Sequence, residues 1–249
     1  MNNSKYWLER AQNVIQSEIQ ADAQATTEIE RIILQMYAEI AKELLAFYAK
    51  YATTAGLTML EVKKNADAFD VKAFRHKAKM YVRRKDFSEE ANRVLKLYNL
   101  TMKISREQLL KQQLDLIVRD TGLNLQSKLE DDLVEAVDRE VERQAHILGE
   151  HVKIDDAEVK AVVNSNFKGV TWSQRLWKDM ALVQKEVEQV TSHVLIRGRH
   201  PNEFVPLFKK KTQSTTYNAS RLLVTESARV QAESQKLTYL KELGEDGEY

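Results

Sequence analysis

Residues 29–48, with the sequence IERIILQMYAEIAKELLAFY, decide the fold of this chain. Their apolar side chains recur at intervals of three and four, and therefore fall on one side of a helix of about five turns. This apolar side is wider than the narrow seam of a coiled coil, which favours packing inside a helical bundle. Its members are Ile29, Ile32, Ile33, Met36, Tyr37, Ile40, Leu44, Leu45 and Tyr48.

A second amphipathic segment precedes this stretch, and its apolar residues follow the same helical period. They are Trp7, Leu8, Ala11, Val14, Ile15 and Ile19. The polar residues 20–27 between the two segments are interpreted as a kink, an exposed turn of one continuous helix, or a break. Residues 51–56 are expected to end the helix that contains the stretch 29–48.

Capping signals predict further helices downstream. Ser105 and Gln108 have the spacing of a capping box, in which each side chain bonds a backbone amide of the other. Gly122 is then expected to end that helix as a left-handed C′ residue. Asp155 and Glu158 have the capping-box spacing for a short helix through residue 163. Between these two segments an apolar residue returns every four positions, at Leu125, Leu129, Leu133, Val137 and Val141.

The C-terminal part predicts two more long helices. Thr171 or Ser173 caps the first, Gly198 ends it, and Pro201 prevents its resumption. Residues 202–208 are expected to form a short helix, which residues 209–212 link to a final helix over about 214–243. The buried side of the first long helix is predicted to contain Leu176, Met180, Val183, Val187, Val190, Val194 and Leu195.

Composition agrees with this pattern, because the chain has only seven glycines and two prolines in 249 residues. No strong alternating strand pattern and no repeat of fixed period is present. The predicted fold class is therefore all-α, an elongated or irregular multi-helix bundle of long amphipathic helices. We expect an N-terminal helical region over 1–152, a C-terminal helical region over 153–243 and an acidic flexible tail over 244–249.

Several classes of protein are disfavoured by what the sequence lacks. The chain has no cysteine, which excludes disulfides, thiolate metal sites and a cysteine nucleophile. No apolar run approaches the roughly 20 residues that span a bilayer, and the polar start has no apolar region behind it. We therefore expect a soluble intracellular protein without a membrane partner. The histidines lack metal-ligand spacing, so no metal and no cofactor are expected; they are His76, His146, His151, His193 and His200.

A basic helix is the candidate nucleic-acid site. Its first four cations fall at spacings of three and four and a further arginine follows directly, so that one face could neutralise the phosphates of double-stranded DNA. The other interpretation is an ordinary solvated face, or a patch that meets an acidic partner. The candidate residues are Lys72, Arg75, Lys79, Arg83 and Arg84.

A polar cluster is predicted in the last helix, where Arg221, Thr225, Glu226 and Arg229 stand at helical spacings. Among neighbours such as Leu222 and Val230 these groups are interpreted as a structural network of paired charges. The alternative is an active site, for example that of a nucleotide-dependent transferase. No nucleophile with an adjacent base, Gly-rich phosphate loop or paired-carboxylate signature accompanies the cluster. An enzyme is therefore not expected.

Three motifs in this part of the chain resemble a known family when they are taken in order. They are FKGVTWSQRLW at 167–177, RGRHP at 197–201 and RLLVTESARV at 221–230. Upstream, YWLER at 6–10, YNLT at 98–101 and SREQLL at 105–110 agree with the same resemblance. The chain resembles the tailed-phage minor head proteins, also called head morphogenesis proteins, the group that contains the F protein of phage Mu.

This resemblance implies a structural function in the virion. It implies a minor capsid protein at the portal vertex of the head, acting in head assembly and in genome packaging or delivery. The implied partners are the portal protein, other capsid or scaffolding proteins and DNA. The implied locations are the head interior and, during assembly, the host cytoplasm. Family members often continue into a further domain with Cys and His positions, so this chain would be a short member or a truncated one.

Overall fold

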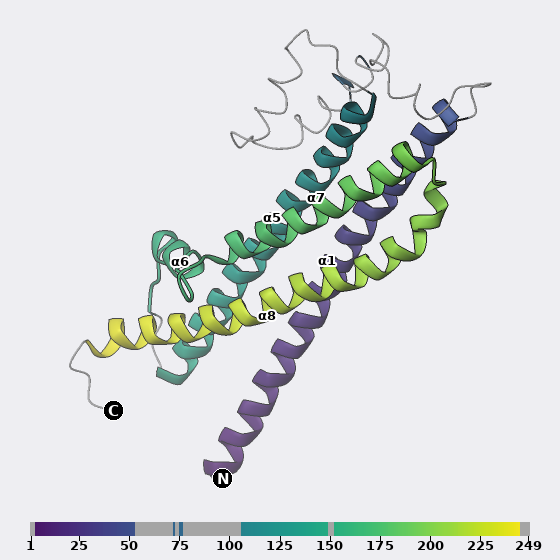
Figure 1. Cartoon of the computed structure of the whole chain (residues 1–249). Helices are drawn as coiled ribbons and strands as arrows, with labels where there is room; N and C mark the ends of the chain where they lie inside the picture. The colour runs from purple at the N-terminus through teal and green to yellow at the C-terminus, as the bar shows by residue number, and fades with distance from the viewer. Residues whose placement is uncertain (1–2, 53–71, 73–74, 77–105, 149–151, 245–249) are drawn as a thin grey trace. The chain divides into compact units, whose positions relative to one another are not determined.

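The computed structural model describes residues 3–52, 72, 75–76, 106–148 and 152–244 (Figure 1). Within these residues the only strand-like pairing is an isolated bridge between Phe167 and Val170. The chain is therefore an all-α multi-helix bundle, as predicted. Its elements are α1 (Asn3–Ala52), α5 (Arg106–Leu148), α6 (Asp156–Val163), α7 (Trp172–Arg197), the 3₁₀ helix η1 (Pro201–Phe204) and α8 (Val205–Leu243).

The predicted helix boundaries around α6 and α7 are confirmed. The Asp155 carboxylate accepts the amide of Glu158 at 2.9 Å, and the Glu158 side chain accepts the amide of Asp155 at 2.9 Å. Thr171 caps α7 in the same reciprocal way with Gln174, at 3.3 and 3.0 Å. Gly198 ends α7 in the left-handed region, with φ of 63°.

One of the three interpretations of residues 20–27, a continuous helix, is confirmed, whereas the predicted helix end at Gly122 is wrong because α5 continues through it. Residues 20–27 lie inside α1. Gly122 lies inside α5 and is buried, so it does not end the helix as predicted. A glycine inside a helix costs about 1 kcal/mol. Each buried leucine on either side of it, such as Leu114 or Leu125, contributes roughly 1.5–3 kcal/mol, which outweighs that cost.

The predicted link at residues 209–212 is also helical and belongs to α8. Thr212 is buried, and its hydroxyl donates to the carbonyl of Phe208 at 2.9 Å. Lys211 forms an ion pair with Glu186 of α7. The burial of Thr212 and the ion pair of Lys211 with α7 keep these residues helical where composition alone indicates a loop.

The chain divides into two compact units that do not follow the predicted boundary near residue 152. Unit 1 contains Met1–Ile32, Asn124–Lys178 and Gln213–Tyr249, and unit 2 contains Ile33–Leu123 and Asp179–Thr212. The predicted boundary divides the chain into two consecutive parts. The two units cannot be separated in that way, because each of the four long helices contributes residues to both of them. The predicted tail lies outside the described residues except for Gly244, which follows the end of α8.

Each unit has its own apolar core. In unit 1 the buried residues include Ile29, Leu125, Leu129, Leu133, Val137, Trp172, Leu176, Leu223 and Val230. In unit 2 they include Ile33, Met36, Tyr37, Ile40, Leu44, Leu110, Leu114, Met180, Val183, Val187, Val190, Val194, Phe204 and Phe208. The stripe predicted for α7 is therefore buried throughout, and most of the stripe at residues 29–48 is buried as well.

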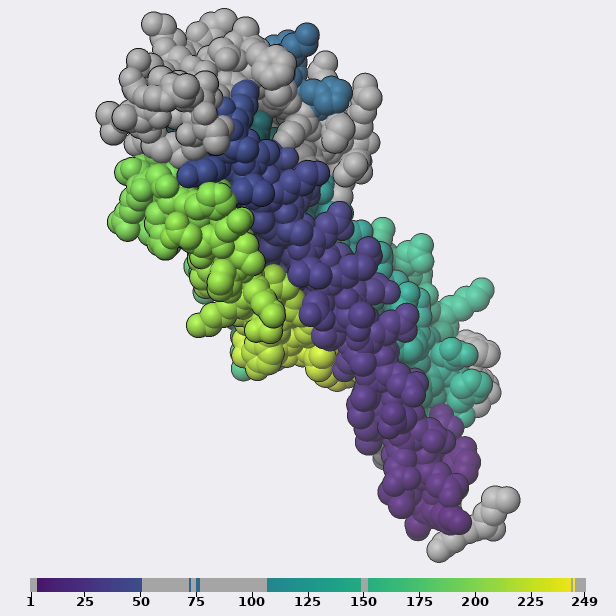
Figure 2. All heavy atoms as spheres, turned by 90° about the vertical axis from the view of Figure 1, so that its right-hand side faces the viewer, coloured from purple at the N-terminus to yellow at the C-terminus, as the bar shows by residue number. Residues whose placement is uncertain are grey.

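The first turns of α1 behave differently, because their large apolar residues are exposed. We call Trp7, Leu8, Ile15 and Ile19 the N-terminal apolar stripe; their exposed fractions are 46%, 60%, 59% and 54%. In Figure 2 the purple N-terminal turns of α1 extend past the teal end of α5 in the same unit. The helical period was predicted correctly here, but the helices of unit 1 leave these side chains uncovered.

Ion pairs join α1 to α5 within unit 1. Glu18 bonds Arg139 at 3.2 Å and Arg143 at 2.7 Å, and Glu28 pairs with Lys128 at 2.9 Å. Burial raises the pKa of Glu18, but hydrogen bonds from Arg139 and Arg143 outweigh burial and hold its pKa below the usual value. The Glu18 pairs therefore stabilise the unit above the usual glutamate range and are lost as the pH falls through the lowered pKa.

The pKa of Asp22, on the same helix, is shifted in the opposite direction, above its usual value. Burial and the neighbouring charge of Glu18 raise its pKa, while Arg139 opposes them. A raised carboxyl pKa means that stability is lost as the pH rises through it. We expect Asp22→Asn to raise the free energy of unfolding at pH 7 by about 0.5 kcal/mol or less, because the group is partly exposed, and to raise the thermal midpoint slightly. Thermal melts from pH 7 to pH 3 should show this advantage disappearing; an advantage that grows on acidification would contradict the assignment.

Candidate functional site: a buried polar network in unit 1

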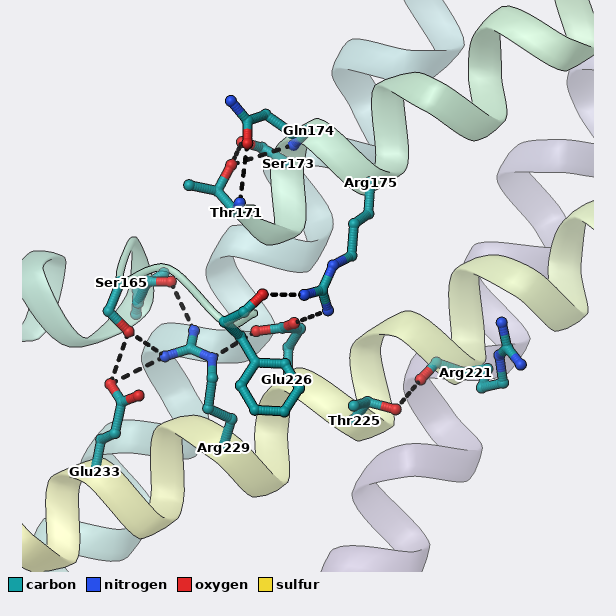
Figure 3. Close-up of polar contacts among 12 residues, drawn as sticks. Ser165, Thr171, Ser173, Gln174, Arg175, Arg221, Thr225, Glu226, Arg229 and Glu233 are labelled. Carbon is teal, nitrogen blue, oxygen red and sulfur yellow. Dashed lines mark hydrogen bonds and ion pairs between the residues drawn. The ribbon is translucent and has the colours of Figure 1, made fainter. Parts of the chain in front are cut away.

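Three segments of unit 1 bring polar side chains together. The capped start of α7 presents Arg175 one turn inside the helix. Helix α8 presents Glu226, Arg229 and Glu233, whose spacings of three and four place them on one side. Helix α6 contributes its last carbonyls, and the connection after it contributes Ser165. Figure 3 shows these groups converging.

Arg229 is the centre of the network and is only 8% exposed. Its guanidinium donates to Glu226 at 2.6 Å, to Glu233 at 3.0 Å and to the Ser165 hydroxyl at 2.5 Å. It also donates to the carbonyls of Val162 and Val163, each at 2.9 Å. Those carbonyls belong to the last turn of α6, where intrahelical partners are missing. The guanidinium therefore both pairs the carboxylates and closes the end of α6.

Glu226 is held between two arginines and is 1% exposed. One carboxylate oxygen accepts from Arg229, and the other accepts from Arg175 at 2.9 Å. Arg175 also donates to the carbonyl of Phe167 and lies over the Phe167 ring, 5.4 Å from its centroid. A carboxylate buried this deeply is tolerated because both oxygens have charged donors.

A tight turn places the Phe167 carbonyl beside Arg175. Phe167 and Val170 exchange backbone hydrogen bonds of 3.1 and 3.4 Å. The two central residues, Lys168 and Gly169, have φ of 54° and 81°. Positive φ at both central positions is what a type I′ turn requires, and glycine adopts it at the lowest cost. The glycine of the FKGVTWSQRLW motif therefore has a conformational function.

Gly169→Ala should destabilise the protein through the backbone alone. A Cβ at this position would have nothing within 4 Å, so that no clash contributes. The left-handed conformation costs an L-residue about 1–2 kcal/mol, and we expect a loss of about that size in urea unfolding. Gly169→Asn is the matched control, since asparagine tolerates positive φ and should retain most of the stability. Equal losses for the two variants would contradict this account.

The structure brings together only part of the predicted polar cluster. Glu226 and Arg229 form its buried pair, whereas Arg221 and Thr225 lie outside it on an exposed side of α8. Arg221 lies over the Tyr217 ring at 5.9 Å, and the Thr225 hydroxyl donates to the Arg221 carbonyl at 2.8 Å. The expectation that Arg221 and Thr225 belong to the buried network is therefore corrected: the face that Arg221 shares with Thr225 is not the face that carries Glu226.

Three members of the network were missed by sequence reasoning. Glu233 lies four residues after Arg229, a spacing that could have identified it. Arg175 lies in a quoted motif, but nothing in its local sequence identifies a partner 51 residues away. Ser165 lies in the turn before that motif and has no recognisable signal of its own.

The candidate DNA-binding helix is described only in part. Lys72 and Arg75 are helical and exposed. Lys79, Arg83 and Arg84 lie outside the described residues, so this nucleic-acid site stays a prediction. The same holds for the Ser105 cap, although α5 begins at the next residue.

Two other kinds of site are absent from the described residues. Within the described ranges, no group of three or more His, Asp or Glu side chains has the geometry to hold a metal ion. No helix in those ranges is long and apolar enough to cross a membrane. Comparison with protein-family models, curated proteins and solved structures gives no match for this chain.

Proposed function

We propose that this chain is a tailed-phage minor head protein that acts at the portal vertex in head assembly and in genome packaging or delivery. The proposal rests on the ordered motifs at 167–177, 197–201 and 221–230. One observation supports it most: Arg175 of the first motif and Glu226 and Arg229 of the third are joined by direct ion pairs of 2.6–2.9 Å. Two of the three motifs that carry the resemblance, at 167–177 and 221–230, therefore stabilise unit 1 together.

A second observation supports an assembly function. The N-terminal apolar stripe exposes four large side chains on one short part of α1, where solvent-exposed helices normally place polar residues. Exposed apolar surface concentrated in one place is typical of protein-interaction sites. A protein partner that covers this stripe would account for its composition.

Co-expression with the portal protein of the same phage tests the proposal. We expect the two proteins to co-purify at moderate salt, without other phage proteins. Ile15→Asp should weaken the complex, because it places a charge in the apolar stripe. Gln16→Asp is the matched control, since it adds the same charge at a neighbouring exposed position. Absence of any complex with a folded chain would remove the portal-associated assignment.

The alternative function is sequence-nonspecific DNA binding through the basic helix. It predicts that affinity for duplex DNA falls steeply with salt, because each neutralised phosphate releases counterions. Reversing Lys72 and Arg75 together should then flatten the salt dependence. Salt-insensitive retention, or no retention, would exclude this alternative while leaving the portal test unaffected.

A further inference from the structure

A pocket of about 390 Å³ opens in unit 1 beside the ion pairs of α1 and α5. We call it the acidic pocket, because its lining contains five carboxylates and two cations. Residues from α1, α5 and α8 contribute, and all of them belong to unit 1. The lining residues used below are Asp22, Lys128, Asp131, Asp132, Arg139 and Ser227.

The two cations do not neutralise this charge. Lys128 is shared between Glu28 at 2.9 Å and Asp132 at 2.5 Å. Arg139 bonds chiefly to Glu18, which does not line the pocket, and lies 3.9 Å from Glu135. Among the described residues, Asp22 and Asp131 have no ion-pair partner. The pocket therefore retains an excess of negative charge.

Unused hydrogen-bonding groups point to a ligand independently of the charge. Ser227 lines the pocket and is only 8% exposed. Two other buried hydroxyls of α8, those of Ser234 and Thr238, donate to the carbonyl four residues earlier, whereas those of Thr216 and Ser220 have no partner among the described residues. The Ser227 hydroxyl has no such bond and no other partner among the described residues. The Oδ2 atom of Asp132 is buried and lacks a hydrogen-bond partner within the same residues.

The pKa directions of two of the carboxylates agree with a site that receives a cation. Burial and the neighbouring Glu135 and Glu28 raise the pKa of Asp132, even though Lys128 lowers it. Burial and the charge of Glu18 raise the pKa of Asp22, as described above. Both groups would be stabilised in their charged form by one additional positive charge.

The lining indicates which cation fits. The carboxylates are not gathered closely enough for a metal ion, since no group of three or more qualifies within the described part of the chain. The volume lies in the range of small-molecule sites. Leu223, Ala21 and Ala25 supply an apolar wall for methylene groups. An ammonium or guanidinium on an alkyl chain satisfies both parts of the lining.

We propose that the acidic pocket binds an alkylammonium or guanidinium group, carried either by a free polyamine or by a basic side chain of another protein. The positive group lies among the carboxylates of Asp22, Asp131 and Asp132, and the Ser227 hydroxyl accepts one of its hydrogen bonds. This site is separate from the N-terminal apolar stripe and does not depend on the proposed function.

Calorimetric titration of the full chain at constant ionic strength tests the proposal. The probes are spermidine, N-acetyl-argininamide and Mg²⁺. We expect saturable binding of at least one organic cation and none of Mg²⁺ at the same concentration. Tighter binding of spermidine would identify a free polyamine as the source, and tighter binding of the capped arginine would identify a protein side chain. No saturable binding, or equal binding of Mg²⁺, would overturn the proposal.

Variants separate the pocket from general surface charge. Asp22→Asn should weaken binding about tenfold or more, the usual worth of a hydrogen bond to a charged group. Ser227→Ala should weaken it less and leave the charge unchanged. Asp138→Asn is the matched control, because this exposed residue of α5 makes the same charge change outside the pocket. Equal effects of Asp22→Asn and Asp138→Asn in folded proteins would mean charge screening and would refute the site.

Discussion

Arg229→Ala is expected to destabilise the protein by about 3–5 kcal/mol, which is the cost of removing one partner from a buried ion pair. Glu226, which is 1% exposed in the intact protein, would keep Arg175 as its single charged partner. The carbonyls of Val162 and Val163 would lose their donor at the same time. A loss of this size is a large share of the stability of an ordinary domain. Urea unfolding, followed by circular dichroism, measures it.

Arg221→Ala provides the matched control for this experiment. It removes the same side chain from the same helix, but Arg221 is exposed. We expect a change within about 0.5 kcal/mol, as for ordinary surface positions. Arg229→Lys should fall between the two, because lysine keeps the charge and loses the planar fork that reaches five acceptors. Equal destabilisation by Arg221→Ala and Arg229→Ala would show that burial is not the cause.

The fold could be predicted from the sequence because most of its signals are local. The periodic apolar residues of α1 and α7 and the capping residues Asp155 and Thr171 each act within one or two turns of their own helix. A pattern that needs no partner to be recognised can be predicted without knowing what it packs against. The all-α class followed from these signals together with the scarcity of glycine and proline.

The errors occurred where tertiary burial overrides a local signal. Glycine is the residue type that commonly ends a helix, yet Gly122 is buried in the middle of α5. Conversely, Leu8 and Ile15 have the period of a buried face, yet they are exposed. In both cases the local pattern was identified correctly, and the outcome depended on which other helix covers that position. The periodicity of one helix contains no information about which other helix packs against it.

The candidate site was predictable to a similar extent. Glu226 and Arg229 stand three residues apart in an apolar helix, so their pairing is a local inference. Their connection to Arg175 and to the last carbonyls of α6 is not local. Arg221 was included because spacing alone does not distinguish the exposed side of α8 from the buried one. The acidic pocket was not predicted, since its carboxylates come from separate helices.

Trp172→Ala is the second change with a large expected effect, again about 3–5 kcal/mol. Trp172 is 1% exposed and is the first residue of α7, three positions before Arg175. Its removal would leave a cavity at the helix start that positions Arg175. Trp7→Ala is the control. Because Trp7 is 46% exposed, its truncation should lower the free energy of unfolding far less. Thermal and urea unfolding of both variants measure the difference.

Trp172→Phe distinguishes packing from hydrogen bonding. The indole N–H of Trp172 is buried without a partner among the described residues, so removing it should not add a penalty. We therefore expect Trp172→Phe to cost much less than Trp172→Ala. If Trp172 also holds Arg175 in place, the double variant Trp172→Ala, Arg229→Ala should lose less stability than the two single losses combined. Strict additivity would instead mean that the ring and the ionic network stabilise unit 1 independently.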